Sequence, residues 1–288
     1  MPDSTRLYST GRAFLARAQH FLEENESLNN LVLGISLRVT QQPGWYRDRI
    51  FLATVESPGG EIRIAAVMTP PYQMVLAGSE DVDDDAIEAL TEALLEQKVE
   101  PPGVNGPARL SERFAVDWSE ANGLNYRVGM RQRVYELRKV NPIPRSPGRL
   151  RTANMEDLDL VVKWREAFTA ESMPGAPAED AREVAGRMIA SGDTYLWEDP
   201  APVSMCVKTR PTPHGTTVSA VYTPPELRRR GYASSIVAAV SQVILDQGKQ
   251  FCTLFTDLAN PTSNSIYQKI GYEPLGDFTV FRFEQPDP

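Results

Sequence analysis

The residues best suited to chemistry lie in segment 221–234, which reads Val-Tyr-Thr-Pro-Pro-Glu-Leu-Arg-Arg-Arg-Gly-Tyr-Ala-Ser. An apolar strand pattern ends there at a Pro-Pro pair, and helical sequence runs from 234 to 247. The free N–H groups and the dipole at a helix start favour an anion. Gly231 and Ala233 leave the backbone open to a ligand, while Arg228, Arg229 and Arg230 add positive charge. The segment predicts a pyrophosphate-binding turn, against the alternative of a solvated basic turn before an ordinary helix.

The spacing of this turn excludes two common phosphate motifs. Arg228-x-x-Gly231-x-Ala233 is neither the Gly-x-x-x-x-Gly-Lys-Ser/Thr of a Walker loop nor the Gly-x-Gly-x-x-Gly of a dinucleotide fingerprint. It resembles the Arg/Gln-x-x-Gly-x-Gly/Ala signature of the GCN5-related N-acetyltransferases (GNAT). That family binds the pyrophosphate of acetyl-CoA at such a strand-to-helix junction.

A second motif lies in segment 258–272, Leu-Ala-Asn-Pro-Thr-Ser-Asn-Ser-Ile-Tyr-Gln-Lys-Ile-Gly-Tyr. Asn260 is a natural helix N-cap, Pro261 a natural first helical residue and Gly271 a natural stop. These roles explain the helix but not its other polar residues. The run resembles the Asn-x-x-Ala/Ser-x-x-x-Tyr-x-x-x-Gly-Phe/Tyr signature that closes GNAT domains. The two motifs come in the family's order, and the resemblance covers roughly residues 150–285.

The resemblance implies direct transfer of the acetyl group from acetyl-CoA, as co-substrate, to an amine. Backbone N–H groups of Val221, Tyr222 and Thr223 would hold the pantetheine arm and the thioester oxygen, where such donors are worth about 3–4 kcal/mol each. Tyr267 would protonate the departing thiolate as general acid; its alternative role is a core tyrosine with a satisfied hydroxyl. The other implied cofactor contacts are Arg228, Arg229, Arg230, Gly231, Tyr232, Ala233, Ser234, Asn260, Ser263 and Asn264.

The base that deprotonates the amine is open at this stage. The sequence offers Glu183, Glu198, Asp199 and Glu226, and a chain of water molecules is an equal alternative. The two histidines, His20 and His214, have no Ser or Cys nucleophile beside them, which disfavours a catalytic triad. No His/Cys/Asp cluster has metal-ligand spacing, so no metal is predicted. Two other functions stay open: an acyl-CoA-binding sensor or scaffold with little turnover, and a transferase for longer acyl chains.

The elements that must position these motifs form a mixed α/β (α+β) fold. A Pro-rich segment, 141–151, is interpreted as a linker between a degenerate GNAT-like domain, 1–140, and an acetyl-CoA-binding catalytic GNAT domain, 152–288. Each domain is expected to have a mostly antiparallel sheet flanked by helices. Segment 66–72, Ala-Val-Met-Thr-Pro-Pro-Tyr, echoes segment 220–226, and 131–137 corresponds to 278–284, which favours tandem duplication over coincidence.

The first copy is expected to have lost the ability to bind the cofactor. After Thr69-Pro70-Pro71 the sequence continues without arginine over 72–78, which fits a strand or a buried turn. Segments 31–39 and 49–56 are predicted strands, and 11–28 and 178–191 are predicted helices. Asp83, Asp84 and Asp85 are predicted to begin a helix, where acidic residues are favourable, rather than to bind a metal.

Composition sets the remaining limits. The chain has 288 residues and a net charge of -8, which argues against general nucleic-acid affinity. No apolar run approaches the ~20 residues that span a bilayer, and the start lacks a secretory signal. Cys206 and Cys252 lie in apolar runs and are interpreted as buried free thiols rather than a disulfide or a nucleophile. We expect a cytoplasmic protein that acts on a small-molecule or peptide amine; a homodimer is open because exposed late strands can pair.

Overall fold

The computed structural model describes residues 2–42, 44, 49–177 and 180–286. It divides into two compact units. The N-terminal unit holds the described residues up to Val134 together with those from Leu275 onward, and the C-terminal unit is Tyr135–Pro274. Each division falls inside a strand, β6 (Asn125–Leu137) or β12 (Glu273–Glu284). These divisions differ from the sequence-based boundaries, because strand pairing rather than the Pro-rich composition of 141–151 decides where a unit ends.

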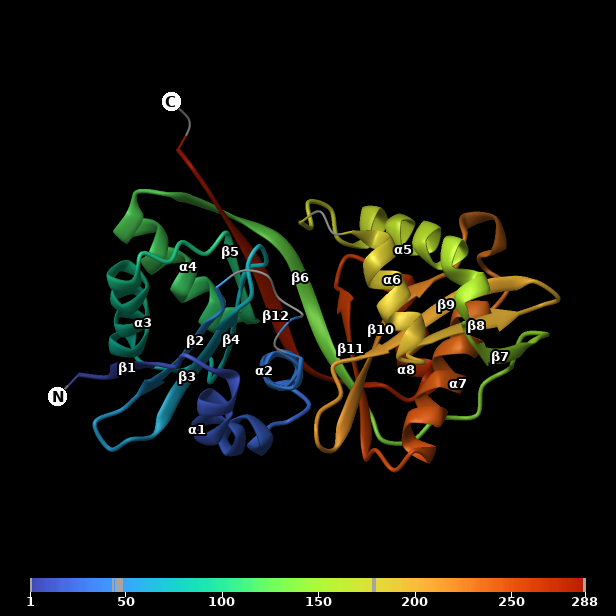
Figure 1. Cartoon of the computed structure of the whole chain (residues 1–288), viewed down its shortest axis with the longest axis horizontal. Helices are drawn as coiled ribbons and strands as arrows, with labels where there is room; N and C mark the ends of the chain where they lie inside the picture. The colour runs from blue at the N-terminus through green and yellow to red at the C-terminus, as the bar shows by residue number, and fades with distance from the viewer. Residues whose placement is uncertain (1, 43, 45–48, 178–179, 287–288) are drawn as a thin grey trace. The chain divides into compact units, whose positions relative to one another are not determined.

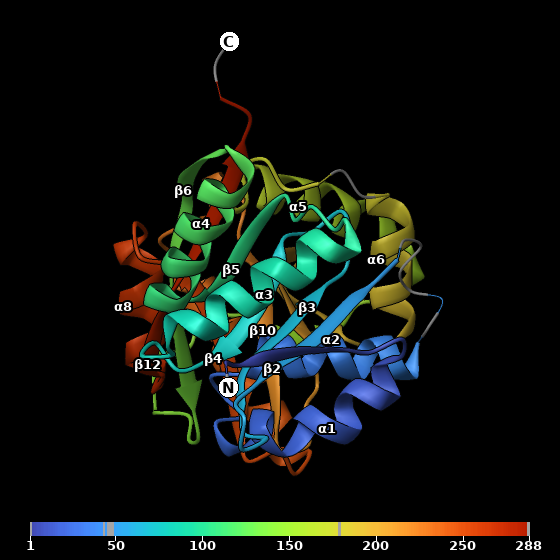
Figure 2. The same ribbon diagram turned by 90° about the vertical axis from the view of Figure 1, so that its left-hand side faces the viewer.

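The N-terminal unit is a sheet in the order β1-β2-β3-β4-β5-β12 with two helices on each face (Figure 2). Every pairing within it is antiparallel except β4–β5, which is parallel. Helices α1 and α2 pack with one set of strand side chains, and α3 and α4 pack with the other. Its elements, besides β12, are β1 (Ser4–Leu7), α1 (Gly11–Glu24), α2 (Asn30–Gln41), β2 (Phe51–Glu56), β3 (Ile62–Met68), β4 (Met74–Gly78), α3 (Asp84–Gln97), β5 (Gly103–Pro107) and α4 (Ala108–Asn122).

The C-terminal unit repeats this plan (Figure 1). Its strands follow the order β7-β8-β9-β10-β11 with β6 beside β11, and from β7 to β11 the pairings are antiparallel except that of the fourth and fifth strands, β10–β11, which is again parallel. Helices α5 and α6 pack on one face, and α7 and α8 on the other. Its elements, besides β6, are β7 (Arg149–Thr152), η1 (Met155–Asp157), α5 (Leu158–Ser172), α6 (Ala181–Ala190), β8 (Thr194–Glu198), β9 (Pro202–Thr209), β10 (Gly215–Tyr222), η2 (Pro225–Leu227), α7 (Tyr232–Asp246), β11 (Phe251–Asp257) and α8 (Pro261–Ile270).

The matching strand orders confirm the predicted architecture of two repeated domains with mostly antiparallel sheets flanked by helices. The last strand of each half is divided between the two units. Tyr135 and Leu137, at the end of β6, lie in the core of the C-terminal unit. Residues Phe278 to Arg282 of β12 pair with β5, and Phe281 lies in the core of the N-terminal unit. The N-terminal sheet is therefore completed by the strand that follows α8, and the end of the strand that follows α4 joins the C-terminal core.

The strand predicted over 31–39 is wrong, because this segment lies within α2. Apolar residues at alternate positions, Leu31, Leu33, Ile35, Leu37 and Val39, imitate the period of a strand. The fully buried positions, however, include Leu33 and Ser36, which are spaced as on one face of a helix. The Ser36 hydroxyl bonds back to the carbonyl four residues earlier, at Val32, with Oγ–O 2.7 Å.

The proposed equivalence of segments 66–72 and 220–226 is also wrong. The first segment follows β3, the third strand of its unit, whereas the second lies at the end of β10, the fourth strand. Segment 72–78 leads into and forms the fourth strand, β4, in agreement with the strand alternative. The element equivalent to β10 is thus β4, and the helix equivalent to α7 is α3.

Most of the helices predicted around the motifs are confirmed. Helix α8 has the predicted bounds, and α7 begins two residues before the predicted start. Of the helix predicted over 178–191, the structure shows α6, while residues 178 and 179 lie outside the described residues. Across the described part of the chain, no helix has both the length and the apolarity needed to traverse a bilayer.

Candidate anion-binding site

Strand β10 loses its pairing with β11, and its pairing with β9 becomes irregular, as it approaches the predicted site. Its parallel register with β11 covers only Gly215 to Thr217. Its antiparallel register with β9 shifts by one residue between Ser219 and Tyr222, and Ala220 takes a left-handed φ of 47°. A bulge of this kind removes a residue from the ladder and turns backbone groups in a new direction. Beyond Thr217 the side of β10 toward β11 is therefore free of strand pairing and can present backbone to a ligand, while Tyr222 still pairs with Met205 of β9.

The loop after η2 is wound tightly ahead of α7. Arg229 has φ 63° and Gly231, the N-cap of α7, has φ 81°. A left-handed conformation costs a non-glycine residue about 1–2 kcal/mol, so Arg229 is strained, as residues at binding loops often are. No side chain caps α7, which leaves the first N–H groups of this helix available. Successive N–H groups in such turns form concave anion sites, and the loop therefore fits a pyrophosphate.

The three arginines of the loop have different roles. Arg228 is held by the protein: its Nε donates to the Thr223 carbonyl at 2.9 Å, and its Nη2 lies 2.7 Å from Oε2 of Glu171 on α5. Its guanidinium also lies 5.8 Å from the centre of the Tyr222 ring. Arg229 and Arg230 are exposed on the loop. Arg228 thus braces the end of β10, and Arg229 and Arg230 supply the charge that faces solvent.

The first turn of α7 is anchored through Tyr232. Its ring is buried, and its hydroxyl donates to Oδ2 of Asp199 at 2.7 Å. This hydrogen bond to a carboxylate raises the pKa of Tyr232 above its ordinary value. The side chain of Tyr232 is therefore structural, and only its backbone N–H is placed to meet an anion. Ala233 and Ser234, which follow in the same turn, are partly exposed.

The polar residues of α8 bond mainly within the protein. Oδ1 of Asn260 accepts the N–H of Ser263 at 3.0 Å, which caps the helix. Asn264 donates to the carbonyls of Asp257 and Asn260 at 3.0 and 2.7 Å and accepts the Tyr135 hydroxyl at 2.9 Å. These contacts assign Asn260 and Asn264 structural roles, and their contact with a cofactor stays a prediction, as does that of Ser263.

Tyr267 is a partly buried residue of α8 packed on the core of the C-terminal unit. Its ring meets that of Tyr272 edge-on, with centroids 6.0 Å apart, and the Tyr272 hydroxyl lies 2.8 Å from Oγ of Ser241. Burial raises the pKa of Tyr267 well above its ordinary value, and a hydrogen bond with Ser263 offsets only part of this rise. The hydroxyl consequently keeps its proton at neutral pH, as a proton donor must.

The acidic residues considered as bases are not gathered at β10. Glu198 is held by Arg149 and Arg151, which lower its pKa, and it is therefore a poor proton acceptor. Asp199 accepts the Tyr232 hydroxyl. Glu183 pairs with Arg187 of the same helix, and Glu226 is exposed on η2. The acid that does reach this region is Glu171, which sequence reasoning missed because its partner Arg228 is 57 residues away.

Both cysteines are buried free thiols, as predicted. Burial raises the pKa of Cys252 to about 12 and also raises that of Cys206. Because the thiolate is the reactive form, neither residue is suited to act as a nucleophile. Within the described ranges, no three His, Cys, Asp or Glu side chains are arranged to hold a metal ion.

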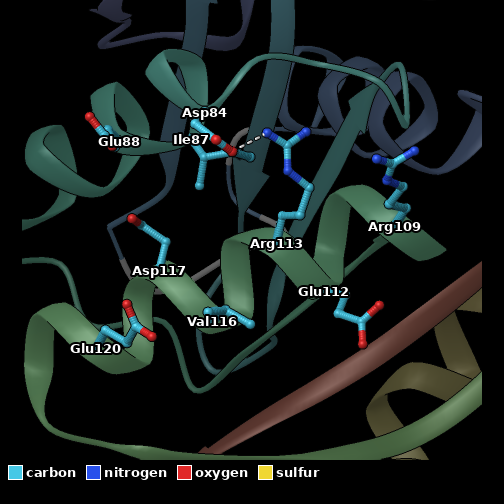
Figure 3. A pocket seen from close by; sticks show the side chains of 9 residues that line it. All are labelled: Asp84, Ile87, Glu88, Arg109, Glu112, Arg113, Val116, Asp117 and Glu120. Atoms are coloured by element: carbon cyan, nitrogen blue, oxygen red, sulfur yellow. Dashed lines mark hydrogen bonds and ion pairs between the residues drawn. The ribbon is translucent and has the colours of Figure 1, made fainter.

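A surface hollow in the N-terminal unit has the opposite chemistry (Figure 3). It lies between α3 and α4, where Arg113 bonds to the Val82 carbonyl and to Asp84. The acids on its walls outnumber the arginines: Asp84, Glu88, Glu112, Asp117 and Glu120 against Arg109 and Arg113. A hollow of this charge repels a pyrophosphate.

Comparisons with known proteins agree with this description. Residues 201–281 match the family model of the FR47-like proteins. A GCN5-related N-acetyltransferase from Sphaerobacter thermophilus is 16% identical with a TM-score of 0.61, over 99% of this chain and 97% of that one. A Drosophila protein is 12% identical with a TM-score of 0.69, over 98% and 99%. A tandem GNAT protein from the clavulanic acid biosynthesis pathway is 11% identical with a TM-score of 0.53, over 99% of each chain.

Among curated proteins, none matches this sequence. At identities this low the likeness of the structures establishes the fold. It confirms the GNAT fold across the length of the chain, and both motifs lie inside the segment that matches the FR47-like model.

Proposed function

We propose that this protein of GNAT fold, FR47-like over residues 201–281, transfers the acetyl group of acetyl-CoA to an amine. The observation that carries the proposal is the junction between β10 and α7. There a bulged strand end, an uncapped helix start and exposed arginines occur within about fifteen residues. These features are independent of one another in sequence, and together they suit a ligand with a diphosphate at one end and a carbonyl group further along.

Each part of the junction has a task in this proposal. The N–H groups from Gly231 to Ser234, with Arg229 and Arg230, hold the diphosphate of the substrate. Backbone N–H groups of Val221 to Thr223 orient the thioester and stabilise the negative charge that develops on its oxygen. Acetyl-CoA supplies an activated acyl group with a thiolate as its leaving group. Tyr267 donates the proton that this thiolate takes up.

The chemistry of the two cysteines supports direct transfer. An acyl-enzyme route needs an activated nucleophile beside a base. Cys206 and Cys252 are buried, and the pKa of each thiol is raised, so both remain protonated. In the route we propose, the amine itself attacks the thioester. Among the four acids first considered as its base, Glu198 is disfavoured by its lowered pKa.

The proposal is tested by release of free CoA thiol in the presence of acetyl-CoA and a panel of amines, which includes polyamines, amino sugars, amino acids and peptide N-termini. We expect amine-dependent thiol release with at least one class, and acetylated product of matching amount by mass spectrometry. Tight CoA binding by calorimetry without release for any amine would contradict the transferase and leave the acyl-CoA sensor. Absence of both binding and release would contradict the site itself.

A further inference from the structure

The segment that precedes β7 contributes a residue to the anion-binding loop. The Oγ of Ser146 donates to the carbonyl oxygen of Arg230 at 2.6 Å, and the N–H of Ser146 donates to Oγ of Ser235 at 2.8 Å. Ser235 is fully buried in the first turn of α7. Ser146 therefore spans the loop and the helix start with one hydrogen bond to each.

These contacts determine the orientation of one peptide group. In a planar trans peptide the C=O and the following N–H point in opposite directions. Because the Arg230 carbonyl is turned toward Ser146, the N–H of Gly231 is turned away from it. A rotation of this peptide would reverse both groups, and glycine at Gly231 offers little resistance to such a rotation. The Ser146 hydroxyl opposes the rotation.

Steric contact adds to this restraint. A Cβ atom at Gly231 would lie 2.7 Å from Oγ of Ser146, so the serine fills the space beside the glycine. Ser146 is itself held in place, because the next residue, Pro147, accepts a hydrogen bond from the indole Nε1 of Trp197 at 2.8 Å. Trp197 is buried in the core of the C-terminal unit. The restraint on the loop is thus anchored to the sheet.

We propose that Ser146 is a positioning residue of the transferase: it fixes the Arg230–Gly231 peptide so that the Gly231 N–H faces the diphosphate of acetyl-CoA. The inference rests on the proposed function. Binding is strongest when donors are already oriented, because less free energy is lost in ordering them. Residues 141–148 belong to the segment 141–151 that the sequence suggests is a linker, and on this view they are part of the cofactor site.

The test uses the full chain and compares two acyl donors. Acetyl-CoA carries the diphosphate, whereas acetyl-pantetheine has the same thioester without it. In S146A the value of kcat/KM should fall about three- to tenfold more for acetyl-CoA than for acetyl-pantetheine, as expected for one oriented hydrogen bond. S235A, which removes the acceptor of the Ser146 N–H, should change the same ratio in the same direction by a smaller factor.

The matched control is S191A, because Ser191 also donates to a backbone carbonyl, that of Met188 at 3.0 Å, but at the end of α6. It should leave the ratio unchanged. Melting temperatures of all variants show whether folding is affected. An equal loss for both donors in S146A, or no loss for either, overturns the positioning role while the transferase stands. If the wild type shows neither CoA binding nor turnover, the proposed function fails first.

Discussion

Two strand-to-helix junctions occupy the same place in the two units and have opposite charge. Between β4 and α3 the chain carries Glu80, Asp81 and Asp83, and Asp84 and Asp85 follow in the first turn of the helix. Between β10 and α7 it carries Arg228, Arg229 and Arg230, and no acidic residue lies in the first turn. Carboxylates at α3 already satisfy the positive end of its dipole. At α7 no carboxylate occupies the positive end of the helix dipole, which stays available to an anionic ligand. The fold therefore places both junctions alike, and their side chains determine which one can bind an anion.

The strands that lead into these helices differ as well. Strand β4 pairs with β3 in an unbroken register from Val75 to Gly78. Strand β10 has a register shift and a left-handed residue at Ala220. On the side of β3, the regular strand β4 uses its backbone groups for sheet pairing, whereas the bulge lets β10 turn some of its backbone groups away from β9. We infer that the N-terminal unit has no acetyl-CoA site of its own.

The largest effect should come from giving α7 the charge of α3. Replacing both Arg229→Asp and Arg230→Asp removes two cations and places carboxylates beside the helix start. Each charge-assisted contact is worth about 1.5–3 kcal/mol, so the Kd for CoA should rise by about 100-fold or more in calorimetry. The matched control is Arg109→Asp in the N-terminal unit, which pairs with Asp81 at 2.8 Å. It should leave the Kd unchanged; a similar loss in both variants would remove the distinction between the junctions.

Tyr267→Phe should have the next largest effect, on turnover rather than binding. Loss of the proton donor should lower kcat by about 100-fold, with the Kd for CoA within about twofold of wild type. Because burial raises the pKa of Tyr267, it does not deprotonate near pH 10. The pH profile of wild type should therefore show no alkaline fall from this residue.

Tyr126→Phe, at an exposed tyrosine of the N-terminal unit, serves as the control and should leave kcat unchanged. Wild-type kcat in Tyr267→Phe would exclude the hydroxyl from proton transfer.

The units should also differ in alkaline stability, because both thiols belong to the C-terminal unit. Cys252 has a pKa raised to about 12 in the folded state, whereas an unfolded thiol titrates near 8.5. The folded state binds the proton more tightly, so the stabilisation is complete below about pH 8.5 and is lost as pH rises toward 12. As the pH rises from 7.5 to 9.5, ionisation of each thiol in the unfolded state should lower the free energy of unfolding by about 1.4 kcal/mol.

Urea unfolding of wild type and Cys252→Ala at these two pH values measures this difference. The variant should lose about 1.4 kcal/mol less than wild type across the interval. Identical losses would show that the thiol is not protected by burial. The comparison uses the pH dependence alone, so any loss of packing in the variant cancels.

The smallest expected effect is a difference in CoA binding between variants of two arginines in the same loop, Arg230 and Arg228. Arg230→Ala should weaken CoA binding about five- to tenfold at low salt and less at high salt, because an exposed charge is screened. Arg228 is already bonded to Thr223 and Glu171. Its replacement by Ala should act through the shape of the loop and show a weaker salt dependence. Equal salt dependence in the two variants would mean that Arg228 also faces the phosphate directly.

Local signals in the sequence were sufficient for the motifs and their helices. Gly231, Asn260, Pro261 and Gly271 act within their own turns, so their types predict α7 and α8. The bulge at Ala220 could not be predicted, because alanine carries no preference for a left-handed φ. The helix over 30–41 was missed because its apolar residues satisfy the period of a strand as well.

Contacts between distant segments could not be predicted from the sequence for another reason. Ser146 meets Arg230 across 84 positions and Arg228 meets Glu171 across 57, and no local pattern records such pairs. The division of β6 and β12 between the two units has no local signal either, since each strand has the composition of an ordinary final strand. These features depend on which strands pair with one another, and that pairing involves segments far apart in the sequence.

The most direct test of the account is the structure of the protein in complex with CoA. We predict phosphate oxygens within hydrogen-bonding distance of the backbone N–H groups between Gly231 and Ser234, with the pantetheine arm along the end of β10. A diphosphate bound at the start of α3, or at any surface away from α7, would contradict it.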